Sequence, residues 1–133
     1  MLNTISISTK SRTELCDITK KVLDVIKTSK VRSGTCQIFI PHTTAGIAIN
    51  ESADPSVVRD VIKGLEAMVP ADRDYEHSED NADAHIKSIL VGTDKTIFIE
   101  AGKLRLGTWQ GIFFCEFDGP RQRQVLIKIT ETK

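Results

Sequence analysis

Apolar and polar residues alternate along several short stretches of this chain, as they do in strands that bury one face. The strictest alternation is at residues 4–9 (TISIST), and a short extended segment is predicted at 14–17. The same pattern, with a few apolar runs, predicts further strands at 35–41, 45–50, 97–99, 111–117 and 125–129. Asp118-Gly119-Pro120 is predicted to form the turn between the last two strands.

Three segments carry helix signals. Thr19 is the predicted N-cap of the first helix, with Ile18 and Leu23 as a hydrophobic staple and an end near Ser29. Its predicted inner face consists of Val22, Val25 and Ile26.

Asp54-Pro55 is the strongest helix start, because aspartate accepts hydrogen bonds from free N–H groups and proline fits the first helical position. That helix is predicted to end near Met68. A charged loop at 71–80 then leads to a third helix, which begins near Asp80 or Asn81 and ends near Leu90.

Short connections between strands favour an α+β fold with a largely antiparallel or mixed β-sheet and about three helices. A length of 133 residues, with no linker or repeat, predicts a single domain over 1–133. Eighteen basic and eighteen acidic residues cancel, so we expect neither nucleic acid nor a membrane surface as partner. The N-terminus lacks a signal peptide's apolar region, and three widely spaced cysteines suit packed thiols. We therefore expect a cytoplasmic protein.

Three histidines lie at the edges of predicted elements. His42 follows a strand, His77 lies in the charged loop and His85 lies on the third helix. Three imidazoles can hold a zinc-like metal and leave a position for water or substrate. The alternative is that each histidine caps a helix or lies half-buried, since spacings of 35 and 8 residues form no metal motif.

Other groups allow two interpretations each. Trp109, between Gly107 and Gly111, is either the largest core anchor or part of a ligand site. Arg121 and Arg123 either bind phosphate or carboxylate, with Lys103 and Arg105, or are solvated. Glu116, within the apolar run FFCEF, points either to solvent or to a partner in a site.

Five motifs together resemble the YjbQ family, which is linked to a secondary thiamine-phosphate synthase activity. They are HTTA at 42–45 leading to Asn50-Glu51, Asp54-Pro55, YEH at 75–77, NADAHIK at 81–87, and LGTWQGI at 106–112 with Glu116 following. The resemblance spans essentially the whole chain. It implies a small α+β protein that assembles as a homotrimer, with a polar site near a subunit boundary.

The resemblance also implies roles for individual residues. His42, His77 and His85 are expected to hold a divalent metal, zinc-like or, for diphosphate chemistry, magnesium. The expected catalytic residues are Asn50, Glu51, Gln110 and Glu116. The expected substrate-binding residues are Thr43, Thr44, Asn81, Trp109, Arg121 and Arg123.

Three functions follow as hypotheses. The first is a synthase that joins a pyrimidine diphosphate to a thiazole phosphate and releases pyrophosphate, so that the partner is a phosphorylated small molecule. The second is a metal-dependent hydrolase with Glu51 or Glu116 as base. The third is a non-catalytic trimer that binds a metal or a small molecule.

Overall fold

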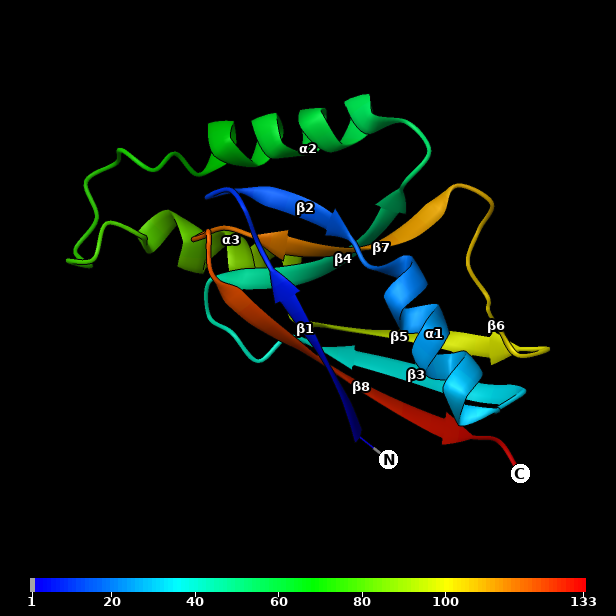
Figure 1. Ribbon diagram of the computed structural model, residues 1–133. Coiled ribbons are helices and arrows are strands. Elements are labelled where there is room, and N and C mark those ends of the chain that lie inside the picture. The colour runs from blue at the N-terminus through cyan, green and yellow to red at the C-terminus, as the bar shows by residue number, and fades with distance from the viewer. Residues whose placement is uncertain (1) are drawn as a thin grey trace.

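The computed structural model describes residues 2–133, which form an α+β fold of two antiparallel sheets and three helices (Figure 1). The strands are β1 (Leu2–Ser8), β2 (Glu14–Asp17), β3 (Ser33–Phe39), β4 (Ala45–Glu51), β5 (Asp94–Glu100), β6 (Lys103–Leu104), β7 (Gln110–Glu116) and β8 (Gln122–Glu131). The helices are α1 (Thr19–Ser29), α2 (Pro55–Met68) and α3 (Ala82–Val91).

The larger sheet has the strand order β1-β8-β3-β5-β6. Alternate residues on its strands, such as Ile97 and Ile99 on β5 or Val125 and Ile127 on β8, are buried in the main core. Alternation in the sequence therefore marked the inward face correctly, because side chains on a strand point to opposite faces in turn.

The smaller sheet has the order β2-β7-β4 and is sandwiched between two apolar layers. Ile112 and Phe114 of β7 face the main core, whereas Phe113 and Cys115 pack with Phe117 in a second cluster. Residues of α2 and α3 contribute to that second cluster, and Figure 1 shows both helices on this side of the sheet. Burial on both faces explains why β7 is a continuous apolar run.

The predicted helix starts are partly confirmed. Asp54 caps α2, since its carboxylate accepts a hydrogen bond from the Ser56 amide at 2.9 Å. The predicted Thr19 cap of α1 was wrong, because Ile18 holds the N-cap position and Thr19 is the first residue of the helix. The Asp17 carboxylate accepts the Thr19 amide at 2.9 Å, and the Thr19 hydroxyl oxygen accepts the Ile112 amide at 2.8 Å. The chain thereby ties the start of α1 to β7.

The fold class is confirmed, including the single domain and the three helices. Two details differ from the sequence prediction. The two-residue strand β6 was not predicted, and residues 118–120 do not close a hairpin, because β7 and β8 lie in different sheets. Within residues 2–133, no helix has the length and apolar character needed to cross a membrane.

The three cysteines are free thiols in the described chain. Cys36 and Cys115 are buried, and burial raises the pKa of Cys36 to about 11 and that of Cys115 to about 12. Thiols with such high pKa values carry little thiolate at neutral pH, so they are packing residues rather than nucleophiles.

Candidate functional site: an arginine-lined cleft beside His42

A cleft of about 540 Å³ opens where the β3–β4 connection meets the start of β8. Apolar residues at the end of β3 form one wall, and hydroxyl, imidazole and guanidinium groups form the other. We call it the His42 cleft; it is lined by Phe39, Ile40, Pro41, His42, Thr43, Thr44, Thr93, Arg121 and Arg123.

A buried ion pair between Glu116 and Arg123 forms the back of this cleft and bridges the two sheets. Arg123 Nε donates to Glu116 Oε1 at 2.9 Å, and Arg123 Nη2 donates to Oε2. The same carboxylate accepts the Thr9 hydroxyl at 2.8 Å and the Asp118 amide at 3.0 Å. Burial opposes ionisation of Glu116, but these donors, Arg123 foremost, keep its pKa below the ordinary value. Glu116 therefore holds Arg123 in place as a carboxylate, and its four hydrogen bonds leave it poorly suited to act as a base.

The arginines present their free donors to the cleft. Only 3% of the Arg123 side chain is exposed, and its Nη2 also donates to the Thr44 hydroxyl at 2.9 Å. Within residues 2–133, Arg123 Nη1 has no hydrogen-bond partner and is not fully buried, and Arg123 is one of the residues that line the cleft. Arg121 is exposed and is anchored to Asp118, whose carboxylate it meets at 3.0 Å. Both guanidinium groups line the cleft, whereas neither Glu116 nor Asp118 does.

His42 contributes a neutral imidazole. Its Nε2 accepts the Gln124 amide at 2.9 Å, so the proton of the neutral ring is on Nδ1. Partial burial, reinforced by the positive charge of Arg123, lowers the pKa of His42. The ring therefore offers an uncharged N–H donor at neutral pH.

A second polar network joins α3 to the cleft. Asn81 Nδ2 donates to Asp118 Oδ2 at 2.8 Å, and this oxygen also accepts Arg121 Nη2. Two residues further on, the buried Asp83 carboxylate binds Lys87 Nζ at 3.1 Å and Arg12 Nη2 at 3.0 Å. Burial works against ionisation of Asp83, yet the hydrogen bonds from Arg12 and Lys87 lower its pKa. Asn81 thus supports the cleft through Asp118, although it does not line it.

The expected three-histidine metal centre is not assembled in the described part of the chain. His77 and His85 meet edge to face with ring centroids 5.2 Å apart, but His42 lies in the cleft with its Nε2 already bonded to Gln124. No three His, Cys, Asp or Glu side chains among residues 2–133 are arranged to hold a metal ion. The prediction failed because the sequence gives no measure of distance between the β3–β4 connection and α3. A divalent metal cofactor stays a prediction, for which residues 2–133 offer only the His77–His85 imidazole pair.

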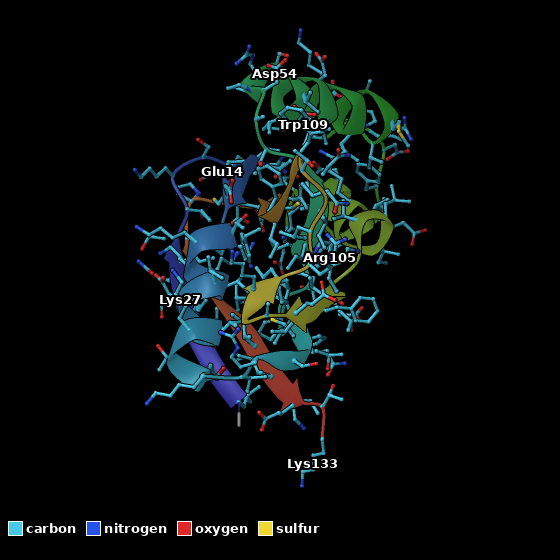
Figure 2. The ribbon with its side chains drawn as sticks, turned by 90° about the vertical axis from the view of Figure 1, so that its right-hand side faces the viewer. Glu14, Lys27, Asp54, Arg105, Trp109 and Lys133 are labelled. Carbon is cyan, nitrogen blue, oxygen red and sulfur yellow. The ribbon has the colours of Figure 1, made fainter. Side chains whose placement is uncertain are left out.

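The remaining predicted residues lie at the far end of the β4–β7 ladder. Glu51 is opposite Gln110, whereas Glu116 is opposite Ala45 at the other end. Six residue steps along a strand separate these ends by roughly 20 Å. Asn50 and Trp109 accompany Glu51 and Gln110 at the far end. The core-anchor interpretation of Trp109 is wrong, since 63% of the residue is exposed, and Figure 2 shows it near the surface at the end by Asp54.

The sequence predicted the polar residues that line the cleft, but not the residues that hold them in place or form the apolar wall. His42, Thr43, Thr44, Arg121 and Arg123 were all predicted site residues, and the structure brings them together. Lys103 and Arg105, considered with the arginines, belong instead to β6 and the segment after it. The residues that were not predicted are Thr9, Thr93, Asp118 and those of the apolar wall, Phe39, Ile40 and Pro41. Of these, Asp118 could have been found from the sequence, because it lies in the predicted turn close to both arginines.

Close relatives of this chain are known. A UPF0047 protein from Methanocaldococcus jannaschii (MJ1081) is 53% identical over 133 residues, covering 100% of this chain and 96% of the relative. The UPF0047 protein YugU from Bacillus subtilis is 46% identical over 130 residues, covering 97% of this chain and 98% of YugU.

Solved structures share the fold. A YjbQ/UPF0047 family protein from Clostridium acetobutylicum matches with a TM-score of 0.94 at 49% identity, covering 96% of this chain and 99% of that one. A YbjQ-like protein of unknown function from Sulfolobus solfataricus matches with a TM-score of 0.95 at 33% identity, covering 99% and 97%.

These findings correct the expected function. The relatives are named only as UPF0047 or YjbQ-type proteins, one of them explicitly of unknown function, so the inference of a thiamine-phosphate synthase or other transferase was wrong. The metal-dependent alternatives rested on the three-histidine site that the described residues do not assemble.

The resemblance itself is confirmed along almost the entire chain. The family model described as UPF0047 protein YjbQ-like matches residues 3–132. With that match, and with relatives above 30% identity over nearly their full length, the chain belongs to the YjbQ-like UPF0047 family.

Proposed function

We propose that the protein binds a small molecule carrying a phosphate group, with the phosphate in the His42 cleft. The observation that carries the proposal is the guanidinium of Arg123. It is almost fully buried and held by Glu116 and Thr44, yet its Nη1 has no partner within the described residues and keeps some exposed surface, and Arg123 lines the cleft. Because the group is already fixed, a ligand orders little of it on binding, which favours affinity.

Four donor groups of three kinds come from residues that line the same cleft. Arg123 Nη1 and the Arg121 guanidinium supply positive charge, the exposed Thr43 hydroxyl supplies a neutral donor, and His42 supplies Nδ1–H. Phosphate oxygens accept such hydrogen bonds, and charge-assisted ones are the strongest. The carboxylates that pair with these arginines, Asp118 and Glu116, do not line the cleft, so the cleft lining carries a positive charge.

The cleft also has room for more than a phosphate. Its volume of about 540 Å³ lies within the ordinary range for small-molecule sites, roughly 300–1,000 Å³. Phe39 and Pro41 offer an apolar wall against which the body of the ligand can pack. The proposal is therefore a phosphorylated organic molecule rather than a free inorganic ion.

The test is the binding of phenyl phosphate, followed by calorimetry, in the wild type and in two variants of exposed cleft residues. Arg121→Gln and Thr43→Val should each weaken binding, Arg121→Gln by at least about tenfold because a charged hydrogen bond contributes about 1.5–3 kcal/mol. Arg105→Gln is the matched control, since Arg105 is an exposed arginine paired with Glu100 outside the cleft.

Two further comparisons sharpen the result. Inorganic phosphate should bind more weakly than phenyl phosphate, and benzyl alcohol should not compete. Equal affinity of all variants for phenyl phosphate, or no saturable binding by the wild type, would refute the proposal.

We further propose that the chain assembles as a homotrimer. Exposed apolar side chains on α3 (Ile86, Ile89 and Leu90) and Phe98 on β5 support this proposal, because patches of exposed apolar surface mark interaction sites, subunit interfaces among them. Analytical ultracentrifugation should give three times the chain mass of 14.7 kDa. Ile89→Asp should shift the mass toward the monomer, whereas a monomeric wild type would contradict the proposal.

A further inference from the structure

A second cavity, of about 500 Å³, lies between α1 and the β5–β6 turn, beside the start of β3, whereas the His42 cleft lies at the end of β3. Figure 2 faces this side, with α1 carrying Lys27 beside the short strand β6. The predicted site did not include it. We call it the α1–β6 pocket; its apolar floor is Leu23, Leu104 and Leu106, and its rim carries Lys27, Arg32 and Lys103.

The rim is positive and its charges are unpaired. None of Lys27, Arg32 and Lys103 forms an ion pair with any of residues 2–133. Glu100 is opposite Lys103 in the strand register, but its carboxylate lies 3.5 Å from Arg105 Nε instead. No Asp or Glu lines the pocket, so three cations face a space without a compensating carboxylate.

The backbone of the β5–β6 turn positions Arg32. Ala101 and Gly102 have φ values of 53° and 74° and form the two-residue loop of the hairpin. The Gly102 amide donates to the Arg32 carbonyl at 2.9 Å. A Cβ at position 102 would lie 3.3 Å from Arg32 Nη1, so glycine lets the guanidinium lie against the turn at the mouth of the pocket.

The leucines supply the other half of the site. Leu23, Leu104 and Leu106 are only partly buried, although Leu104 and Leu106 pack against the main core. Their exposed apolar surface is removed from water when an apolar group fills the pocket. An apolar floor beneath a ring of cations fits a ligand with an apolar body and one anionic end.

We propose that the α1–β6 pocket binds a small amphipathic anion, with an aliphatic or aromatic body on the three leucines and a carboxylate or phosphate at Arg32, Lys27 and Lys103. This site shares no residue with the His42 cleft, so the proposal stands independently of the function proposed above.

Octanoate is the probe, titrated into the ¹⁵N-labelled full chain and followed by NMR. The amides of Ala101 and Gly102 should shift in a saturable way, and shortening the chain to hexanoate should weaken binding, by up to about fourfold for each methylene removed. Octanol tests the contribution of the charge and should bind more weakly than octanoate. Octyl phosphate should bind through the same amides, since the rim recognises charge rather than one acid.

Arg32→Gln and Lys103→Gln remove rim charges from exposed residues without ion pairs, so the fold should be retained. Each should weaken octanoate binding by about two- to fivefold, as expected for exposed charge pairs, and leave octanol unaffected. Lys63→Gln, an exposed lysine on α2, is the control and should change nothing.

Three results would overturn the proposal. One is octanoate shifts confined to amides outside the pocket, such as those around Phe39. Another is equal affinity for octanoate in the wild type, Arg32→Gln and Lys103→Gln. The third is octanol binding as tightly as octanoate, which would reduce the pocket to an apolar surface patch.

Discussion

Replacing Glu116 by glutamine keeps the size of the side chain but removes the charge on which the ion pair depends. The carboxylate accepts four hydrogen bonds, two on each oxygen. A glutamine amide must turn its NH₂ group toward one pair of donors, either Arg123 Nη2 and the Asp118 amide or Arg123 Nε and the Thr9 hydroxyl. At least two hydrogen bonds are lost either way, and the buried guanidinium loses its counter-charge.

The expected loss follows from these contacts. Removing one partner of a buried ion pair lowers the free energy of unfolding by about 3–5 kcal/mol. The whole free energy of unfolding of a single domain is about 5–15 kcal/mol, so this loss is a large share of it. With a urea m-value of about 2 kcal/mol per M, the unfolding midpoint of Glu116→Gln at pH 7 should fall by about 2 M. Circular dichroism during urea unfolding measures this directly.

The matched control is Glu100→Gln. Glu100 also faces an arginine, but at 3.5 Å and with 74% of its side chain exposed, so the change should alter the free energy of unfolding by less than about 1 kcal/mol. The reasoning about the buried pair would be refuted if the two variants lost similar stability.

The pH dependence gives a second check on the same pair. The pKa of Glu116 is lower in the folded state, so its contribution is fully present above the ordinary glutamate value of about 4.3 and is lost as pH falls through the folded-state pKa. The stability difference between the wild type and Glu116→Gln should therefore shrink in acid. A difference that stayed constant down to the acid unfolding region would contradict the assignment.

Three further predictions concern other parts of the chain. Asp83→Asn should lower the free energy of unfolding by about 3–5 kcal/mol, because Lys87 Nζ is buried and loses its carboxylate partner; a loss below about 1 kcal/mol in urea unfolding would contradict this. His42 should titrate below the ordinary value of about 6.5 in NMR, and a normal or raised midpoint would contradict the effect of its partial burial beside the charge of Arg123. Ala101→Asn should raise stability by about 0.5–1 kcal/mol in thermal unfolding, because a φ of 53° in a hairpin turn costs alanine more than asparagine; an unchanged or lower midpoint would argue against it.

Local patterns predicted most of the secondary structure. Asp54-Pro55 marked the start of α2 because capping and proline geometry act within one turn. The alternation at 4–9 marked β1 because the buried face of a strand repeats every second residue. The strand β6 has only two residues, too few for any period to register.

Pairing between distant elements was beyond the reach of local patterns. Residues 118–120 carry the residues of a hairpin turn, yet the chain crosses there from one sheet to the other. That crossing brings Arg123 of β8 into contact with Glu116 of β7. Arg123 is therefore the ion-pair partner of the glutamate in the apolar run FFCEF, which the sequence alone could not identify. The residue types of the cleft were therefore predictable, but their arrangement depended on which sheet each strand joined.

The length of the β4–β7 ladder sets a limit on how the conspicuous polar residues of this chain can cooperate. A metabolite of ordinary size is much shorter than the roughly 20 Å between Glu116 and Glu51. Residues at the two ends of the ladder in one subunit therefore cannot contact the same small molecule. If Arg123 and either Gln110 or Trp109 contact one small substrate together, they must belong to neighbouring chains. Mixing two inactive variants, one altered at each end, would then restore activity by forming hybrid assemblies.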